Sequence, residues 1–306
     1  MAITAGMVKE LREMTGAGMM DCKKALTETN GDMDAAVEVL RKSGAAKMEK
    51  KQSRIAAEGI ARVAVNGNVA VVAEVNSETD FVAKNETFQE FVQTVADTAL
   101  ASGLNGGANG EDIDALLATN GLSELLVEKT ATIGEKLSVR RFAKVTGDVV
   151  TSYIHGGGRI GVIIAANGAT DDAAKEAITN IAMQVAAMNP KYVSKDEVSE
   201  EYKAHELEIL VAQAKNDPKN ANKPDNIIEK MVQGRLNKEL KEVCLLEQEY
   251  VKAENKESVA QYVANVAKAN GCKLAIKKFV RFETGEGLEK KNEDFAAEVA
   301  AQMAGN

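Results

Sequence analysis

The chain has 306 residues, of which 45% are hydrophobic and 27% charged, so we expect two or three folded domains rather than a disordered or collagen-like chain. The net charge of −8 argues against a nucleic-acid-binding surface, and the lack of any run of about 18 apolar residues argues against a membrane span. Three widely separated cysteines and two histidines predict neither a disulfide framework nor a zinc site, and they favour the reducing cytoplasm.

Residues 1–55 are predicted to form a small domain of three helices. Thr4 can cap the first helix, the second runs over about 19–26, and Asp32 can cap the third. Gly44 is expected to end the third helix. So small a bundle offers little core, which indicates a module tethered to a larger body.

Residues 56–140 are predicted to form the first of two α+β subdomains. Period-two alternation predicts strands at 60–65 and 69–75, joined by an Asn66-Gly67 turn of type I′. A helix with one apolar face follows at 86–101. The remainder is expected to hold a glycine-rich loop at 103–110 and helical stretches near 111–118 and 123–134.

The second subdomain is predicted from two separate stretches, 141–193 and 245–283. A strand that begins near Leu137 is expected to pair with residues 149–154 across a turn at Gly147. The other predicted elements here are strand 160–166, helix 171–188, helix 258–270 and strand 273–282.

A helical hairpin is predicted between these stretches, at 194–244. Ser194 and Glu197 have the spacing of a capping box. Spacings of four and three residues predict a coiled-coil-like stripe on its first helix, made of Val198, Tyr202, His205, Ile209 and Ala212. Such a hairpin should project from the body and serve self-association or a partner contact. The chain then closes with a predicted helical module at 284–306, whose apolar face is Phe295, Val299 and Met303.

An internal repeat links the two subdomains. Residues 68–76 align without a gap with residues 159–167, at an offset of 91 (167 − 76). The Thr-Asp pair at 79–80 recurs at the same offset, but the next residue is Phe81 in the first copy and Asp172 in the second. Two interpretations of Phe81 are open: it folds back onto the core, or it is an exposed aromatic anchor for a partner's pocket.

No motif in the chain requires an enzyme. The run Gly156–Gly161 matches G-x-G-x-x-G, but a strand is predicted after it where a dinucleotide site needs a helix. We therefore interpret the run as a hairpin turn. His155 and His205 have no Cys, His or Ser partner at a recognisable spacing, which favours packing or contact roles over catalysis.

Two long segments resemble signatures of the bacterial elongation factor Ts family. These are Leu11–Leu26 and Glu74–Lys84, and shorter family-like runs lie within 152–162 and at 281–287. The resemblance covers essentially the whole chain in order. It implies an α+β fold: a ubiquitin-associated-like N-terminal domain of three helices, a core of two related α+β subdomains interrupted by a helical hairpin, and a C-terminal helical module.

The resemblance also implies guanine nucleotide exchange on elongation factor Tu, a GTPase. The matching second signature would enter the GTPase near its Mg²⁺ and promote GDP release, through Thr79, Asp80, Phe81 and Val82. Further partner contacts are expected from Arg12, Met19, Met20 and His155. The factor would need no metal or cofactor of its own and would contact neither membrane nor nucleic acid directly. The hairpin at 194–244 is the candidate contact for a homodimer.

Two other classes of protein make different predictions. An enzyme that uses the glycine-rich turn for a nucleotide would bind that nucleotide as an isolated chain. A scaffold or adaptor would bind its partner through the three-helix module without changing nucleotide release.

Overall fold

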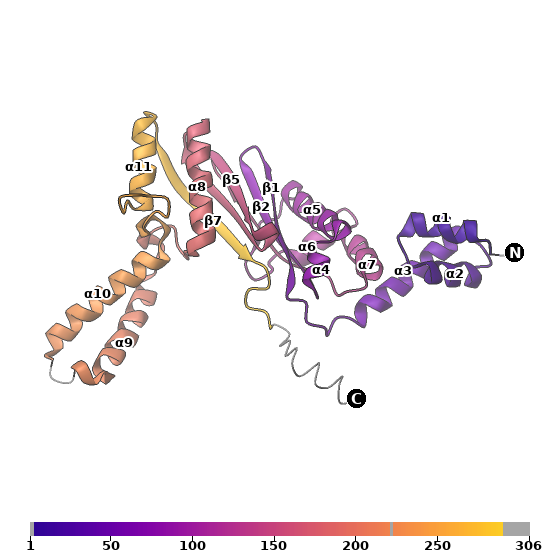
Figure 1. Cartoon of the computed structure of the whole chain (residues 1–306), viewed down its shortest axis with the longest axis horizontal. Coiled ribbons are helices and arrows are strands. Elements are labelled where there is room, and N and C mark those ends of the chain that lie inside the picture. Colours follow the sequence, from indigo (N-terminus) through magenta and orange to yellow (C-terminus); the bar gives the residue numbers. More distant parts are fainter. Residues whose placement is uncertain (1–2, 221–222, 290–306) are drawn as a thin grey trace.

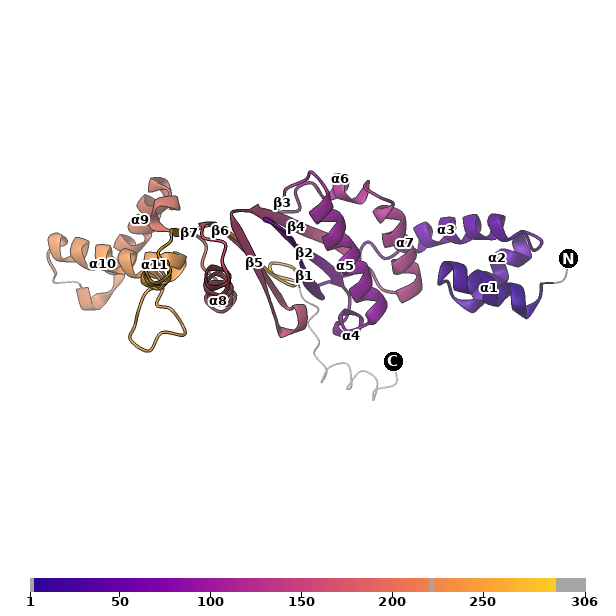
Figure 2. The same ribbon diagram turned by 90° about the horizontal axis from the view of Figure 1, so that it is seen from above.

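The computed structural model describes residues 3–220 and 223–289, and the molecule is elongated. The N-terminal helices lie at one end, two packed sheets lie in the middle, and the helical hairpin lies at the other end (Figures 1 and 2). Within these residues, no helix is long and apolar enough to cross a membrane. The predicted apolar face of the tail, at Phe295, Val299 and Met303, lies outside the described residues.

The N-terminal module has the three expected helices, α1 (Ala5–Thr15), α2 (Met19–Glu28) and α3 (Met33–Glu49). The Thr4 hydroxyl accepts a hydrogen bond from the Met7 amide, and the Asp32 carboxylate accepts one from the Ala35 amide, which confirms both predicted caps. The small buried core consists of Val8, Leu11, Cys22, Ala25, Leu26 and Ala36.

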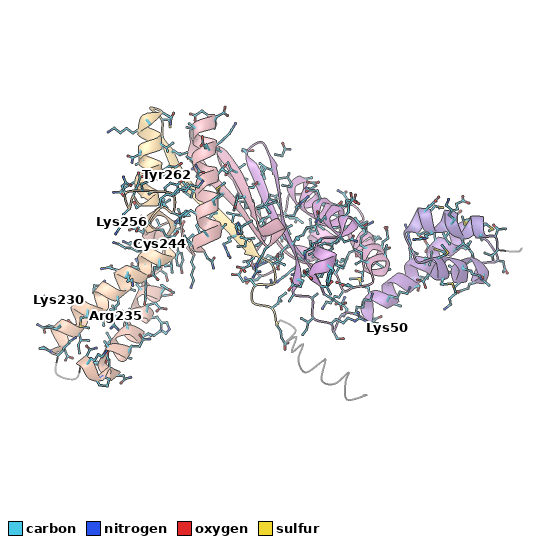
Figure 3. The ribbon with its side chains drawn as sticks, in the orientation of Figure 1. Lys50, Lys230, Arg235, Cys244, Lys256 and Tyr262 are labelled. Atoms are coloured by element: carbon cyan, nitrogen blue, oxygen red, sulfur yellow. The ribbon has the colours of Figure 1, made fainter. Side chains whose placement is uncertain are left out.

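The predicted end of α3 at Gly44 is wrong, because the helix continues to Glu49. Gly44 is buried instead, and a Cβ there would lie 3.3 Å from Val127 Cγ1 and 3.6 Å from Ala131 Cβ. Both of these residues belong to α7 (Leu122–Ile133). The glycine therefore permits close helix packing rather than helix termination, and α3 ends beside Lys50 (Figure 3).

The first sheet is antiparallel with strand order β1-β2-β4-β3. Its strands are β1 (Glu58–Asn66), β2 (Val69–Ser77), β3 (Gly106–Gly107) and β4 (Ser138–Thr146). The predicted 103–110 loop thus contains a short strand. The hairpin turn is displaced by one residue from the prediction: Asn66 pairs with Val69, and only Gly67 of the two loop residues has positive φ, which excludes type I′.

Helices cover the outer face of this sheet. They are α4 (Asp80–Ala83), α5 (Glu86–Ala101), α6 (Ile113–Leu117) and α7. The predicted apolar face of α5 is confirmed, because Phe88, Phe91, Val92 and Val95 are all buried against the sheet.

The second sheet is also antiparallel, with order β5-β6-β7. Its strands are β5 (Val149–His155), β6 (Ile160–Gly168) and β7 (Leu274–Glu283), with the turn η1 (Gly156–Gly158) between the first two. Its outer face is covered by α8 (Asp172–Met188) and α11 (Val259–Ala269).

The predicted pairing of β4 with β5 is wrong. Strand β4 pairs with β2, starting from Thr146 opposite Val69, and the chain then changes sheets at Gly147. A Cβ on Gly147 would lie 2.7 Å from the carbonyl oxygen of Ala166, so only glycine fits at this crossing. The change of sheet falls after residue 146, and the expected subdomain boundary at 140 cuts through β4.

The internal repeat is visible in the two sheets. Strand β2 pairs with a strand on each side, β1 and β4, and β6 likewise pairs with β5 and β7. The two strands start 91 residues apart (160 − 69). The register irregularity between Glu74 and Val75 recurs at that offset between Ala165 and Ala166. The copies differ after the central strand, because α8 is continuous whereas Asn85 starts a new helix after α4.

The two sheets pack face to face through a layer of small apolar side chains. This layer consists of Ala61, Ala70, Val72, Ala143, Val145, Val150, Ile163, Ala165 and Phe282. Gly161 lets the sheets approach closely, since a Cβ there would lie 3.0 Å from Val72 Cγ2 and 3.1 Å from Ala61 Cβ.

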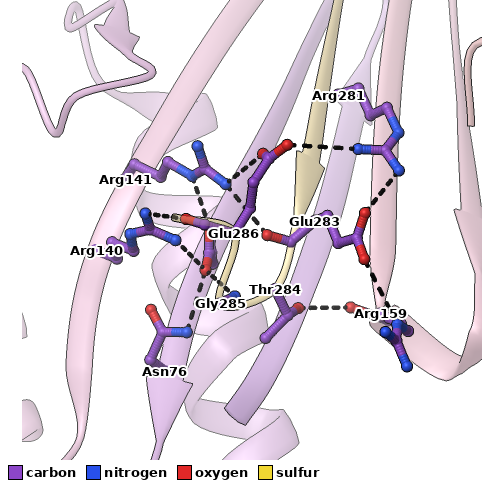
Figure 4. A network of polar contacts seen from close by, with 11 residues as sticks. Asn76, Arg140, Arg141, Arg159, Arg281, Glu283, Thr284, Gly285 and Glu286 are labelled. Carbon is purple, nitrogen blue, oxygen red and sulfur yellow. Dashed lines mark hydrogen bonds and ion pairs between the residues drawn. The ribbon is translucent and has the colours of Figure 1, made fainter. Parts of the chain in front are cut away.

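A buried charge network closes one end of this layer (Figure 4). The side chain of Glu74 is fully buried. Its carboxylate accepts hydrogen bonds from Arg140 Nη1 at 2.9 Å, Arg141 Nε at 2.5 Å and the Gly285 amide at 2.8 Å. Glu74 therefore ties β2 to β4 and to the segment that follows β7.

The predicted hairpin consists of α9 (Glu200–Asn216) and α10 (Asp225–Val243), and the short helices η2 (Lys195–Glu197), η3 (Pro218–Asn220) and η4 (Leu245–Glu247) flank it. It projects from the body, and Cys244 lies at its base while Lys230 and Arg235 lie farther out (Figure 3). Its buried core is Val198, Leu210, Ala214, Ile228, Val232, Leu236, Leu240 and Cys244.

Two details of the hairpin differ from the prediction. Of the expected stripe, Val198 is buried and Tyr202 partly buried, but His205, Ile209 and Ala212 are exposed, because α9 presents Leu210 and Ala214 to α10 instead. The capping box at Ser194 is also absent. Ser194 caps only η2, Glu197 accepts from the Val193 amide, and Ser199 caps α9.

We expect Glu74→Gln to lower the free energy of unfolding by about 3–5 kcal/mol, because Arg141 would stay buried without its main counter-charge. Urea denaturation followed by circular dichroism measures the change. Glu13→Gln is the control, since the Glu13–Lys9 ion pair is exposed and worth at most about 1 kcal/mol. Equal stabilities for the two variants would contradict a structural role for the Glu74 charge.

Candidate protein-interaction site

Phe81 is the most exposed large hydrophobic side chain among the described residues, at 79%. It lies on α4, a single helical turn between β2 and α5 (Figure 1). Phe81 therefore does not fold back onto the core. We call residues Thr79–Val82 the wedge turn.

The wedge turn buries one side while it exposes the other. Thr79 caps α4, and its hydroxyl accepts a hydrogen bond from the Val82 amide at 3.4 Å. Val82 and Ala83 pack against the core of the first subdomain. Burial of these two side chains fixes the direction in which Phe81 points away from the core.

Asp80, beside Phe81, forms an exposed ion pair with Lys84. The Lys84 Nζ lies 2.7 Å from Asp80 Oδ2 and 5.9 Å from the centre of the Phe81 ring. The hydrogen bond from Lys84 lowers the pKa of Asp80 below its ordinary value of 3.8. The tip of the wedge turn therefore carries a carboxylate that stays ionised near neutral pH.

Glu135, which no sequence pattern indicated, holds the start of the wedge turn. Its Oε2 accepts hydrogen bonds from the Glu78 and Thr79 amides, each at 3.0 Å, and its Oε1 accepts from the Thr79 hydroxyl at 2.6 Å. Glu135 follows α7 and its Gly134 cap. No local pattern could have found it, because its partners lie 56 and 57 residues earlier.

The next residue, Lys136, contacts the linker that leaves the N-terminal module. Its Nζ donates to the carbonyl oxygens of Gln52 at 2.6 Å and Arg54 at 2.9 Å. Its amide donates to Glu78 Oε1 at 2.6 Å, and Arg54 forms an ion pair with Glu78 at 3.1 Å. The linker and the base of the wedge turn are thus connected by polar contacts.

His155 is the last residue of β5, next to the turn η1. It is exposed at the end of β5, and its Nδ1 is 3.1 Å from the Tyr153 hydroxyl. A Cβ on Gly158 of η1 would lie 2.9 Å from Ile60 Cβ, so this turn packs on the start of β1. The start of β1 in turn pairs with the end of β2 at Ser77.

Arg12 belongs to α1, and Met19 and Met20 belong to α2. Both helices lie apart from α4, which carries the wedge turn (Figures 1 and 2). All three are exposed, Met19 by 56% and Met20 by 75%. They occupy the end of α1 and the start of α2. The predicted contact residues therefore form two separate surfaces, one on the module and one at the end of the sheets.

The glycine-rich run does not lead into a helix, as a dinucleotide site of this motif requires. The Gly156–Gly158 run makes η1 and is followed directly by β6, as the hairpin interpretation predicted. Across residues 3–220 and 223–289, no three His, Cys, Asp or Glu side chains gather to hold a metal ion. Large exposed apolar side chains on two separate surfaces are typical of a protein that acts by binding another protein.

Comparison with known proteins agrees with this class. Residues 78–286 match the family model described as Elongation factor TS. The chain is 55% identical over 310 residues to Elongation factor Ts of Clostridioides difficile (strain 630), covering 98% of this chain and 99% of that protein. The chain belongs to the elongation factor Ts family. Membership implies nucleotide exchange on elongation factor Tu in protein biosynthesis.

Proposed function

We propose that the chain releases GDP from elongation factor Tu by inserting the wedge turn beside the Mg²⁺ site of the GTPase. The observation that supports this best is the 79% exposure of Phe81 on a turn held by Val82 and Glu135. An aromatic side chain with two torsions that already points outward loses little entropy on binding. We place this activity in the cytoplasm.

The proposed effect on GDP follows from the charge of the Mg²⁺ ion in the GTPase. Mg²⁺ neutralises the diphosphate of bound GDP, so moving the elements that hold the ion weakens nucleotide binding. Phe81 would open an apolar pocket, and the ionised Asp80 would lie beside the displaced elements. His155 would contribute a second contact, because the turn beside it packs on the start of β1, which pairs with the end of β2 just before the wedge turn. The factor needs no metal or cofactor of its own for this step.

The N-terminal module would bind the GTPase separately through Arg12, Met19 and Met20. Methionine side chains are flexible and polarisable, so they suit an adaptable apolar contact. Two linked contacts also raise the effective concentration of the second once the first has formed. The coupling is reciprocal: if the factor weakens GDP binding, GDP weakens the factor's binding equally.

Phe81→Ala should slow factor-promoted GDP release at least about tenfold. This corresponds to an activation free energy for release that is about 1.4 kcal/mol higher than with the native factor. Stopped-flow release of fluorescent GDP from elongation factor Tu measures this. Val65→Ala is the matched control, because Val65 is also an exposed hydrophobic residue, at 43%, near the hairpin turn of β1 and β2. We expect no change for it.

Three other outcomes would redirect the proposal. Acceleration that survives Phe81→Ala would move the mechanism to other contacts, with His155→Ala tested next. Binding to elongation factor Tu without any acceleration would support an adaptor instead. Nucleotide binding by the isolated chain, measured by calorimetry, would support the enzyme alternative.

Replacing both exposed methionines, Met19→Ala with Met20→Ala, should raise the factor concentration that gives half-maximal release about five- to thirtyfold. The maximal rate should stay the same, because the change removes binding area away from the Mg²⁺ site. The same stopped-flow assay over a range of factor concentrations separates the two parameters. A lower maximal rate with an unchanged half-saturating concentration would contradict the separate role of the module.

The hairpin also supports a proposal of self-association. Ile209 of the predicted stripe, 37% exposed on α9, and Ile227, 45% exposed on α10, would face a second copy. Sedimentation equilibrium should then find a dimer for the native chain and a monomer for Ile209→Glu. A native chain that stays monomeric at high concentration would rule out this contact.

A further inference from the structure

We propose that Glu135 and Lys136 form a joint that sets the wedge turn and the N-terminal module in a fixed relation to each other. The inference rests on the proposed function and deepens it, because it assigns a positioning role to two residues outside both contact surfaces. We call this pair the joint.

The Glu135 half of the joint is what holds the wedge turn at its start. Helix α4 has only four residues and cannot hold its own shape, because helix nucleation is unfavourable. Its internal cap, Thr79 to Val82, is long at 3.4 Å. The Glu135 carboxylate supplies three shorter bonds, to the Glu78 amide and to the amide and hydroxyl of Thr79. Charge-assisted bonds of this kind are about twice as strong as neutral ones.

The Lys136 half of the joint holds the linker from the module. The ammonium group caps the carbonyl oxygens of Gln52 and Arg54, which come just after α3 ends at Glu49. The Lys136 amide donates to Glu78, the residue whose own amide donates to Glu135. The two halves are therefore coupled through Glu78 as well as through the chain.

Helix α7 completes the connection, because the joint follows it directly. The same helix packs on Gly44 of α3 through Val127 and Ala131, and a Cβ on Gly16 would lie 3.3 Å from Thr132 Oγ1. The module, α7, the joint and the wedge turn thus form one continuous chain of contacts. Because their relative orientation is already fixed, two contact surfaces held in this way lose little conformational entropy when both bind one partner.

The two halves of the joint predict different kinetic effects. Glu135 acts through the placement of Phe81, so its loss should lower the maximal rate of GDP release. Lys136 acts through the placement of the module, so its loss should raise the half-saturating concentration and leave the maximal rate unchanged. A general loss of stability would not separate the two parameters in this way.

The first experiment is a double-mutant cycle in the stopped-flow assay. Glu135→Ala should lower the maximal rate about tenfold in the native background, but no more than about twofold in the Phe81→Ala background. Glu111→Ala is the matched control, because Glu111 also accepts a loop amide, that of Asn109 at 2.9 Å, outside the joint. Equal effects of Glu135→Ala in both backgrounds would overturn the positioning role.

The second experiment tests Lys136→Met against Lys144→Met. Lys144 also donates to two backbone carbonyls, those of Leu100 and Ser102, but away from the module and the wedge turn. We expect Lys136→Met alone to raise the half-saturating concentration, by about fivefold or more. The same shift in both variants, or none in either, would overturn the role of Lys136.

Hydrogen exchange of the free chain tests the Glu135 contacts without the GTPase. In Glu135→Ala, the amides of Glu78 and Thr79 should exchange at least about tenfold faster, with no change in Glu111→Ala. If Glu135→Ala does not fold, Thr79→Val removes the hydroxyl donor from the other side of the same contact. Failure of the native chain to accelerate GDP release would sink the proposed function, whereas unchanged exchange at these amides would sink the joint.

Discussion

The buried carboxylate of Glu74 limits how the rest of the molecule can be arranged. A charge in this position would be very unfavourable without donors, and besides Asn76 of β2 these come from β4 and from the backbone beyond β7. The two sheets and the segment after β7 must therefore meet in one geometry for the carboxylate to be satisfied. Strand β2 carries this carboxylate and leads directly into the wedge turn, so the base of that turn is fixed relative to both sheets.

The wedge turn shows how one copy of a repeat can acquire a separate role. In the second copy, a continuous helix follows the Thr-Asp pair and buries its apolar face on the sheet. In the first copy, the helix is interrupted before Asn85, which leaves a short turn with Phe81 outside. Asn85 caps the new helix at the interruption, and the carboxylate of Glu135, from a distant part of the chain, holds the start of the short turn. Exposure of the aromatic ring is thus maintained by contacts that are not local.

Local signals in the sequence predicted the helix caps at Thr4 and Asp32, the limits of α5 and the repeat of strand and helix. The errors arose where the deciding contact was distant in sequence. Gly44 has the local features of a helix end, but its fit against α7 decides otherwise. Strand β4 pairs with β2 rather than its neighbour, and Glu135 contacts residues more than fifty positions away. For Phe81 the sequence left two interpretations open, and the choice of an exposed side chain over a buried one required the folded structure.

The course of α3 has a consequence for how the molecule unfolds. Its first half completes the small N-terminal core, and its second half packs on α7 of the first subdomain. Because one uninterrupted helix belongs to both, melting it would expose apolar surface on each side at once. The module, whose own core is too small for much stability, thus shares in the cooperativity of the larger body. Local opening of the N-terminal end is correspondingly restricted to α1 and α2.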